Sequence, residues 1–310
     1  MTESVENQAP NWPAGFWLPI DKPVAFTSHD VVAKARRLLG IRKMGHSGTL
    51  DPDVTGVLLL AVGKATRLIQ YLPGEKVYRG VIRFGSSTDS QDASGQVLEE
   101  RPVPELAESE LRAVLTSFLG RQSQLPPMVS AVSFQGKRLY QLARQGIEVP
   151  ERPAREITIQ QLDLLNWTSP DLEIEVRCSA GTYIRTLAHD LGQKLGCGAH
   201  LLRLCRIEAN GVTLKQTIPL LEVRPEPAAL PLLPMDAPLR HLSDLLLTAA
   251  EGRRFQMGQL FVPAVSGPFA EPLRIYAEGL FLGMGELEPE TLNLRSLCVL
   301  EQPQLLPELA

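Results

Sequence analysis

The chain has 310 residues, of which 44% are hydrophobic and 21% charged, which is ordinary for a globular protein with room for two domains. No stretch approaches the roughly 18–20 uninterrupted apolar residues of a membrane span, and the polar first residues lack the order of a signal peptide, so we expect no membrane partner and a cytoplasmic location. The four cysteines form no CxxC pair, which argues against a disulfide framework and a zinc site, and the net charge of −4 argues mildly against a nucleic-acid partner.

The N-terminal part of the sequence predicts a disordered tail over residues 1–12, then a short apolar strand over Phe16–Pro23 and a helix. Thr27 or Ser28 can cap this helix, and Gly40 ends it. Its apolar face consists of Val31, Val32, Ala35, Leu38 and Leu39. Five basic residues without an acid lie on the other side or just after it: Lys34, Arg36, Arg37, Arg42 and Lys43. A solvated helix face and an RNA-facing surface explain this local excess equally well.

The run G-H-S-G-T-L-D-P-D-V-T-G, from Gly45 to Gly56, places Asp51 directly before a proline. Glycine permits unusual backbone angles and proline restricts the residue before it, so Asp51 is expected on a stiff, non-helical loop. The apolar run Val57–Val62 behind it indicates a buried strand or a short buried helix. A carboxylate with few conformational options suits catalysis, but Asp-Pro is more commonly a simple turn, and spacing alone favours the turn.

The next segments predict a helix over Thr66–Tyr71, a half-buried strand over Lys76–Gly85 and an amphipathic helix over Glu105–Leu119. By residue type alone, Tyr78 in this strand is a core or edge residue. The segment Ser86–Gly95 is expected to be a polar loop. Its two acids, Asp89 and Asp92, do not complete a cation-binding pattern.

Basic residues alternate with Tyr140 between Gln135 and Gly146, which suits an element that follows phosphates with one stacking ring. Further on, Asp171–Ser179 alternates as a strand should, and Gly181–Gly192 turns from it into a helix. Tyr183 and Arg185 lie at this junction, where side chains commonly point into a site. By itself, however, Arg185 fits an ordinary helix-surface arginine better.

Six prolines between Pro219 and Pro238 predict a linker or irregular segment. The remainder contains short strand-like runs over Gln259–Val262, Leu273–Ala277 and Leu280–Leu287, which suit a small β-barrel.

Four segments resemble, in the same order, the bacterial tRNA pseudouridine synthases of the TruB family. They are I-D-K-P-x-x-x-T-S from Ile20, the loop that carries Asp51, K-x-Y-R from Lys76, and S-A-G-T-Y-I-R-T-L-A-x-D-L-G from Ser179, which continues to Arg206. Two positions depart from the family pattern. Ala25 stands where a glycine is usual, and Val54 stands where a small alanine is usual.

The resemblance implies an α/β (α+β) fold with a mixed, largely antiparallel central sheet of the pseudouridine synthase type and flanking helices. It places a catalytic domain at residues 13–238, with an insertion at about 124–155 that closes over RNA, and a small PUA-like β-barrel that binds RNA at 239–310. The implied reaction converts the uridine at position 55 in the T loop of tRNA to pseudouridine, without a cofactor or a metal. We expect the protein to act on the tRNA T stem-loop as a monomer.

The resemblance also assigns roles to individual residues. Asp51 is the catalytic aspartate, either as a nucleophile at C1′ or as a base at C2′, and Arg185 pairs with it. The others contact the substrate or support the site: Tyr78 stacks on the target base, Tyr183 packs beside it, His46 helps to hold the RNA, Leu204 lies against the ribose and uracil, and Lys22 supports the pocket floor.

Three alternatives stay open at this stage. Asp51 and Asp53 could form a carboxylate pair that hydrolyses a nucleoside bond. The protein could instead be a non-catalytic RNA-binding or tRNA-folding module. Finally, it could be a relative that acts with a guide RNA and partner proteins.

Overall fold

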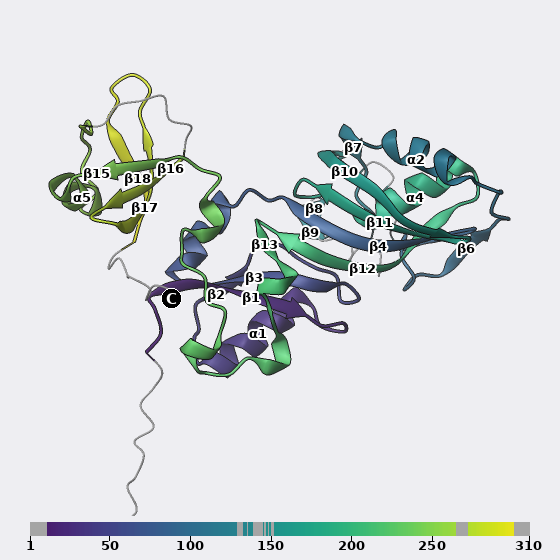
Figure 1. The fold of residues 1–310 in the computed structure, drawn as a ribbon, viewed down its shortest axis with the longest axis horizontal. Coiled ribbons are helices and arrows are strands. Elements are labelled where there is room, and N and C mark those ends of the chain that lie inside the picture. The colour runs from purple at the N-terminus through teal and green to yellow at the C-terminus, as the bar shows by residue number, and fades with distance from the viewer. Residues whose placement is uncertain are drawn as a thin grey trace, which may run out of the picture. The chain divides into compact units, whose positions relative to one another are not determined.

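The computed structural model describes residues 11–128, 152–264 and 272–300, and between 129 and 151 only positions 133, 134, 136–138, 145, 147 and 149 (Figure 1). The chain divides into two compact units. The first contains Met1–Pro52, Val57–Pro73 and Asn210–Ala310, and the second contains Asp53–Gly56 and Gly74–Ala209. No helix among the described residues is long and apolar enough to cross a membrane. Nearly half of the predicted insertion at 124–155, and residues 1–10 of the predicted tail, lie outside the described residues.

The first unit contains a small sheet with the strand order β14-β1-β3, and β2 pairs with the end of β3. The strands are β1 (Gly15–Lys22), β2 (Met44–His46), β3 (Thr55–Gly63) and β14 (Ile218–Pro219). The helix α1 (Ser28–Leu39) begins with a capping box between Thr27 and Asp30 and ends at Gly40, which has a φ of 68°. The predictions of a strand at the N-terminus, the helix after Thr27 and a buried strand over Val57–Val62 are confirmed.

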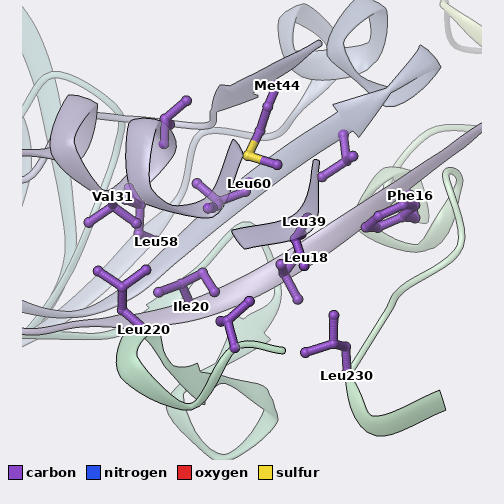
Figure 2. Close-up of a cluster of buried hydrophobic side chains, with 14 residues drawn as sticks. Phe16, Leu18, Ile20, Val31, Leu39, Met44, Leu58, Leu60, Leu220 and Leu230 are labelled. Atoms are coloured by element: carbon purple, nitrogen blue, oxygen red, sulfur yellow. The ribbon is translucent and has the colours of Figure 1, made fainter. Parts of the chain in front are cut away.

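One face of α1 packs on this sheet (Figure 2). Val31 and Leu39 of α1 lie among Leu18 and Ile20 of β1 and Leu58 of β3, all buried. Full burial of such side chains contributes roughly 1.5–3 kcal/mol each, so this core fixes α1 firmly against β1 and β3.

The C-terminal part of the first unit contains a second sheet with the order β15-β16-β17-β18 (Figure 1). Its elements are β15 (Asp244–Leu247), α5 (Ala249–Gln256), β16 (Leu273–Ala277), β17 (Leu280–Leu287) and β18 (Leu294–Val299). Phe255 of α5 is buried with Leu245, Leu273 and other strand residues in a core of their own. The strands predicted over Leu273–Ala277 and Leu280–Leu287 are confirmed, whereas closure of this sheet into a barrel stays a prediction.

The strand predicted over Gln259–Val262 is absent from the structure of this segment, where Phe261 makes only an isolated bridge to Leu294. The backbone groups of the segment bind the end of α5 instead. Gln259 donates its backbone N–H to the carbonyl of Arg254 (3.0 Å), and the Arg254 side chain reaches the carbonyl of Leu260 (3.5 Å). These groups are therefore not available for a regular ladder.

Short 3₁₀ helices connect the elements of the first unit: η1 (Lys64–Tyr71), η2 (Leu214–Gln216), η3 (Leu220–Glu222), η4 (Pro227–Ala229) and η5 (Ala237–Leu239). The helix predicted over Thr66–Tyr71 is thus present in 3₁₀ form. The two-residue strand β13 (Val212–Thr213) precedes η2.

The second unit contains a sheet with the order β12-β4-β11-β10-β7, in which all neighbours are antiparallel. The strands are β4 (Lys76–Phe84), β7 (Gly120–Gln124), β10 (Arg155–Thr168), β11 (Asp171–Cys178) and β12 (Ala199–Ala209). Thr55 and Gly56, the first residues of β3, pair with β12 in parallel. The sheet is therefore mixed and largely antiparallel, as predicted.

Two helices, α2 (Glu108–Thr116) and α4 (Ile184–Leu195), pack on one face of this sheet and contact each other (Figure 1). A hairpin of β5 (Ser86–Thr88) and β6 (Val97–Glu100) occupies part of the predicted polar loop, and a short pair, β8 (Ser133–Phe134) and β9 (Lys137–Arg138), lies in the predicted insertion. The strand over Asp171–Ser179 and the helices near 105–119 and 181–192 are confirmed.

Gly56 permits the close approach of β3 and β12. Its φ is 102°, and a Cβ added there would lie 2.2 Å from the carbonyl oxygen of Arg206. We expect Gly56→Ala to lower the free energy of unfolding by about 2–4 kcal/mol, because the added methyl forces both an unfavourable φ and a backbone shift.

Gly40→Ala is the matched control, because Gly40 also has a positive φ (68°) but nothing lies within 4 Å of an added Cβ. It is expected to cost only about 1 kcal/mol in chemical denaturation. Equal losses for the two variants would show that the Arg206 backbone does not limit position 56.

Candidate active site

The Asp51 loop connects β2 to β3 and is non-helical, as predicted. It is anchored on both sides by buried residues, Leu50 and Val54. Between them Asp51, Pro52 and Asp53 are exposed, so the loop presents the acid at its surface while its flanks are held in the interior. The carboxylate of Asp51 is therefore accessible from solvent, and the loop that carries it is anchored at both ends.

Lys22 forms hydrogen bonds to the backbone at the base of this loop. Its side chain is fully buried, and its ammonium group donates to the carbonyls of Phe26 (2.7 Å), Pro23 (2.9 Å) and Pro52 (3.1 Å). The backbone N–H of Ala25 donates to the same Pro52 carbonyl (3.0 Å). Ala25 adopts a φ of 64°, the left-handed region in which glycine is easiest, which accounts for the usual glycine at this position in the resemblance. Lys22 is therefore not an exposed turn lysine.

His46, at the end of β2, has its ring oriented by two neighbours. Its Nδ1 accepts a hydrogen bond from the backbone N–H of Gly48 (3.3 Å). The ring of His29 meets it edge-on, with centroids 5.5 Å apart. An imidazole that accepts at Nδ1 carries its proton on Nε2, so this bond selects one tautomer for contact with a ligand.

Arg185 lies in the first turn of α4 and is only 5% exposed, so it is not a helix-surface arginine. Its Nη1 donates to Oδ2 of Asp92 at 3.2 Å. The guanidinium carbon is 6.0 Å from the centroid of the Tyr183 ring. Tyr183 is itself fixed at the helix start, because its backbone N–H and carbonyl both bind the side-chain amide of Gln124 (2.8 and 3.1 Å).

Asp92 is a partner of Arg185 that the sequence did not reveal, since by residue pattern it was considered only as a cation ligand. Its other oxygen, Oδ1, accepts from the Ser90 hydroxyl (2.6 Å), the Ser94 hydroxyl (2.6 Å) and the Ser94 N–H (3.0 Å). These bonds fix the orientation of the carboxylate, whose Oδ2 accepts the hydrogen bond from Arg185. The signal in the sequence was the S-x-D-x-S spacing, which is typical of an Asp that binds its own turn.

Tyr78 and Leu204 lie on neighbouring strands of the second unit. Tyr78 of β4 is 7% exposed and stands opposite Val176 on one side and Arg206 on the other. Leu204 of β12 stands opposite Gly80, where an added Cβ would lie 3.0 Å from the Leu204 Cδ1. Gly80 thus leaves the space that Leu204 occupies over β4.

Lys76 begins β4 on the same face as Tyr78, and burial, then the charge of Arg206, lowers the pKa of its ammonium group from 10.5 to about 8. The folded chain therefore releases this proton above pH 8 while the unfolded chain keeps it, so stability rises with pH from that point. Burial raises the pKa of the neighbouring Cys178 thiol from 9.0 to about 11, which makes stability fall above pH 9. We expect the free energy of unfolding to rise by about 1 kcal/mol between pH 8 and 9 and then to level off.

Denaturant titrations across this pH range measure that rise, with Lys76→Met as the control that lacks it. A variant with the same slope as the wild type would contradict the assignment to Lys76.

The structure thus distributes the predicted residues between the two units. Lys22, His46 and Asp51 belong to the first unit. Tyr78, Tyr183, Arg185 and Leu204 belong to the second. The pairing of Arg185 with Asp51, and the convergence of all seven residues on one base, stay predictions.

Comparison with known proteins identifies the family. Residues 36–184 match the model described as TruB family pseudouridylate synthase (N terminal domain). A protein of Synechococcus sp. (strain ATCC 27144 / PCC 6301 / SAUG 1402/1), named tRNA pseudouridine synthase B, is 49% identical over 273 residues, which cover 86% of this chain and 92% of that protein. A protein of Heliobacterium mobile with the same name is 43% identical over 274 residues, covering 87% and 89%.

Among solved structures, the fold is similar to that in the crystal structure of a Cbf5-Nop10-Gar1 complex, with a TM-score of 0.70 and 22% identity over 96% of this chain and 91% of that one. At that identity the likeness concerns the fold alone. The sequence relatives carry the assignment, and the chain belongs to the TruB family of pseudouridylate synthases.

Proposed function

We propose that this protein converts the uridine at position 55 in the T loop of tRNA to pseudouridine, with Asp51 as the catalytic group. The observation that carries the proposal is the Asp51 loop, held rigidly at its base by Lys22 and Ala25, in a chain that spans 92% of a relative named tRNA pseudouridine synthase B.

The reaction is an isomerisation in which the N1–C1′ bond of uridine breaks, the uracil rotates, and a C5–C1′ bond forms. The proton on C5 is lost and N1 gains one, so atoms and electrons balance without an oxidant or reductant. Asp51 acts as an ionised carboxylate, either by attacking C1′ or by removing the proton at C2′.

The substrate base must leave the T-loop stack, which costs a few kcal/mol. In our proposal Tyr78 stacks on the everted base, Tyr183 packs beside it, Leu204 contacts the ribose and uracil, and His46 holds the RNA. The guanidinium of Arg185, buried and oriented by Asp92, offers a fixed positive charge for the Asp51 carboxylate. Lys22 supports the floor beneath Pro52.

The wider organisation is part of the same proposal. Residues 13–238 form the catalytic domain, the insertion at about 124–155 closes over the T stem-loop, and the four-stranded sheet β15-β16-β17-β18 belongs to a PUA-like RNA-binding domain over 239–310. The protein works in the cytoplasm as a monomer on tRNA.

The decisive experiment is incubation of the purified protein with an unmodified tRNA transcript, followed by mapping of pseudouridine at single-nucleotide resolution. We expect one new pseudouridine, at position 55, and none in a transcript with cytidine there. Free uracil in the products would favour the carboxylate-pair hydrolase, and binding without conversion would favour a non-catalytic RNA-binding module. Activity of the single protein on bare tRNA would exclude a need for guide RNA and partner proteins.

A further inference from the structure

The first turn of α1 makes a second contact with the Asp51 loop, at the residue before Asp51, whereas Lys22 binds the residue after it. Ser28, the first residue of α1, is 1% exposed. Its hydroxyl oxygen accepts a hydrogen bond from the backbone N–H of Leu50 at 2.8 Å, and the same hydroxyl donates to the Leu50 carbonyl at 3.3 Å. One side chain therefore engages both backbone groups of the residue that precedes Asp51.

These contacts restrain the backbone next to Asp51. The Leu50 carbonyl belongs to the peptide group that leads into Asp51, so the Ser28 hydroxyl limits rotation on that side. On the other side, Lys22 and Ala25 bind the Pro52 carbonyl, at 3.1 and 3.0 Å. The backbone of the loop is thus held on both sides of Asp51, at Leu50 by Ser28 and at Pro52 by Lys22 and Ala25.

Ser28 is a rigid reference point because α1 is fixed independently of the loop. The side-chain hydroxyl of Thr27 accepts from the Asp30 N–H (3.1 Å), and the Asp30 carboxylate accepts from the Thr27 N–H (2.9 Å), which closes the helix start. Farther along, Val31 and Leu39 anchor the helix in the core with β1 and β3 (Figure 2). The packing of α1 in the core thus fixes the position of Ser28, and the hydrogen bonds of Ser28 fix the position of Leu50 in the loop.

We propose that Ser28 is a positioning residue for Asp51: it holds the Leu50–Asp51 peptide so that the carboxylate meets the reacting sugar in the productive geometry. This role rests on the proposed function. A misplacement of about 1 Å at a reacting group can cost about a hundredfold in rate, so the loss of this clamp affects the chemical step more than RNA binding.

The test compares Ser28→Ala with Thr27→Ala and Ser28→Thr. Ser28→Ala removes the clamp, Thr27→Ala weakens the same helix start without touching Leu50, and Ser28→Thr keeps the hydroxyl. Three quantities are measured for each protein: the single-turnover rate of pseudouridine formation, the Kd for the tRNA transcript, and the melting temperature.

We expect Ser28→Ala to lower the single-turnover rate by about 10- to 100-fold, with a Kd within about threefold of the wild type. Thr27→Ala is expected to keep the wild-type rate although its melting temperature falls, and Ser28→Thr to recover most of the rate. A wild-type rate in Ser28→Ala, or an equal loss in Thr27→Ala, would overturn the proposal.

Amide hydrogen exchange at Leu50 provides a measurement that does not depend on whether Ser28→Ala folds. In the wild type and in Thr27→Ala this amide should be protected, and fast exchange in the folded wild type would refute the clamp. The two proposals fail differently: a wild type that makes no pseudouridine refutes the function, whereas an active wild type with an equally active Ser28→Ala refutes only the role of Ser28.

Discussion

Asp51→Asn is expected to abolish pseudouridine formation while the protein still folds and binds tRNA. The substitution keeps the size of the side chain but removes the negative charge that either version of the mechanism needs, at C1′ or at C2′. Asp51 is exposed and its flanks are anchored by Leu50 and Val54, so the variant should still fold. We expect the single-turnover rate to fall by more than about 10³-fold.

Asp53→Asn is the matched control, because Asp53 lies two residues away in the same loop and is also exposed. It should retain activity close to that of the wild type. Measurable pseudouridine from Asp51→Asn would defeat the assignment of Asp51. An equal loss in Asp53→Asn would instead point to a pair of acting carboxylates.

Arg185→Lys is expected to lose at least about 100-fold in turnover although the positive charge is kept. A lysine has neither the planar fork nor the reach of the guanidinium, so the bond to Asp92 and the position of the charge over Tyr183 are both lost. Because the side chain is buried, the ammonium also has no water with which to replace these contacts. The Kd for tRNA should change much less than the rate.

Arg83→Lys provides the comparison, since Arg83 makes a two-bond pair with Asp171 (2.8 and 2.7 Å) at a more exposed place on β4. It tests whether the loss of any arginine fork in the second unit lowers activity, and it should leave turnover nearly unchanged. Near-normal turnover in Arg185→Lys would count against a role for this arginine beside the acid. Asp92→Asn should resemble Arg185→Lys if Asp92 orients the guanidinium.

Elements that are stabilised by residues close together in the sequence could be predicted from the sequence. The helix α1 has its capping box, its apolar face and its terminal glycine within a span from Thr27 to Gly40. The strands β3 and β11 have uninterrupted patterns, one apolar from Val57 to Val62 and one alternating. The Asp51 loop could be predicted from its residue order, because glycine permits unusual backbone angles and proline restricts the residue before it wherever they occur.

Two long strands that were not predicted, β10 and β12, lose their alternation at bulges. Register shifts occur at Ile159/Gln161 and Leu164/Asn166 in β10, and at Leu201/Arg203 and Arg206/Glu208 in β12. Each shift moves the following side chains to the other face of the sheet, so no single period runs through either strand. The register of such strands depends on the neighbouring strands with which they pair.

Contacts between residues far apart in the sequence were decided only by the tertiary structure. The bond between Asp92 and Arg185 joins residues 93 positions apart, and that between Ser28 and Leu50 joins residues 22 positions apart. No local pattern encodes these partners, because a hydrogen bond forms wherever the packed core places a donor beside an acceptor. The sequence by itself therefore determined the family and the regular elements that have an uninterrupted local pattern, whereas folding decided which side chains hold the acid loop and the arginine in place.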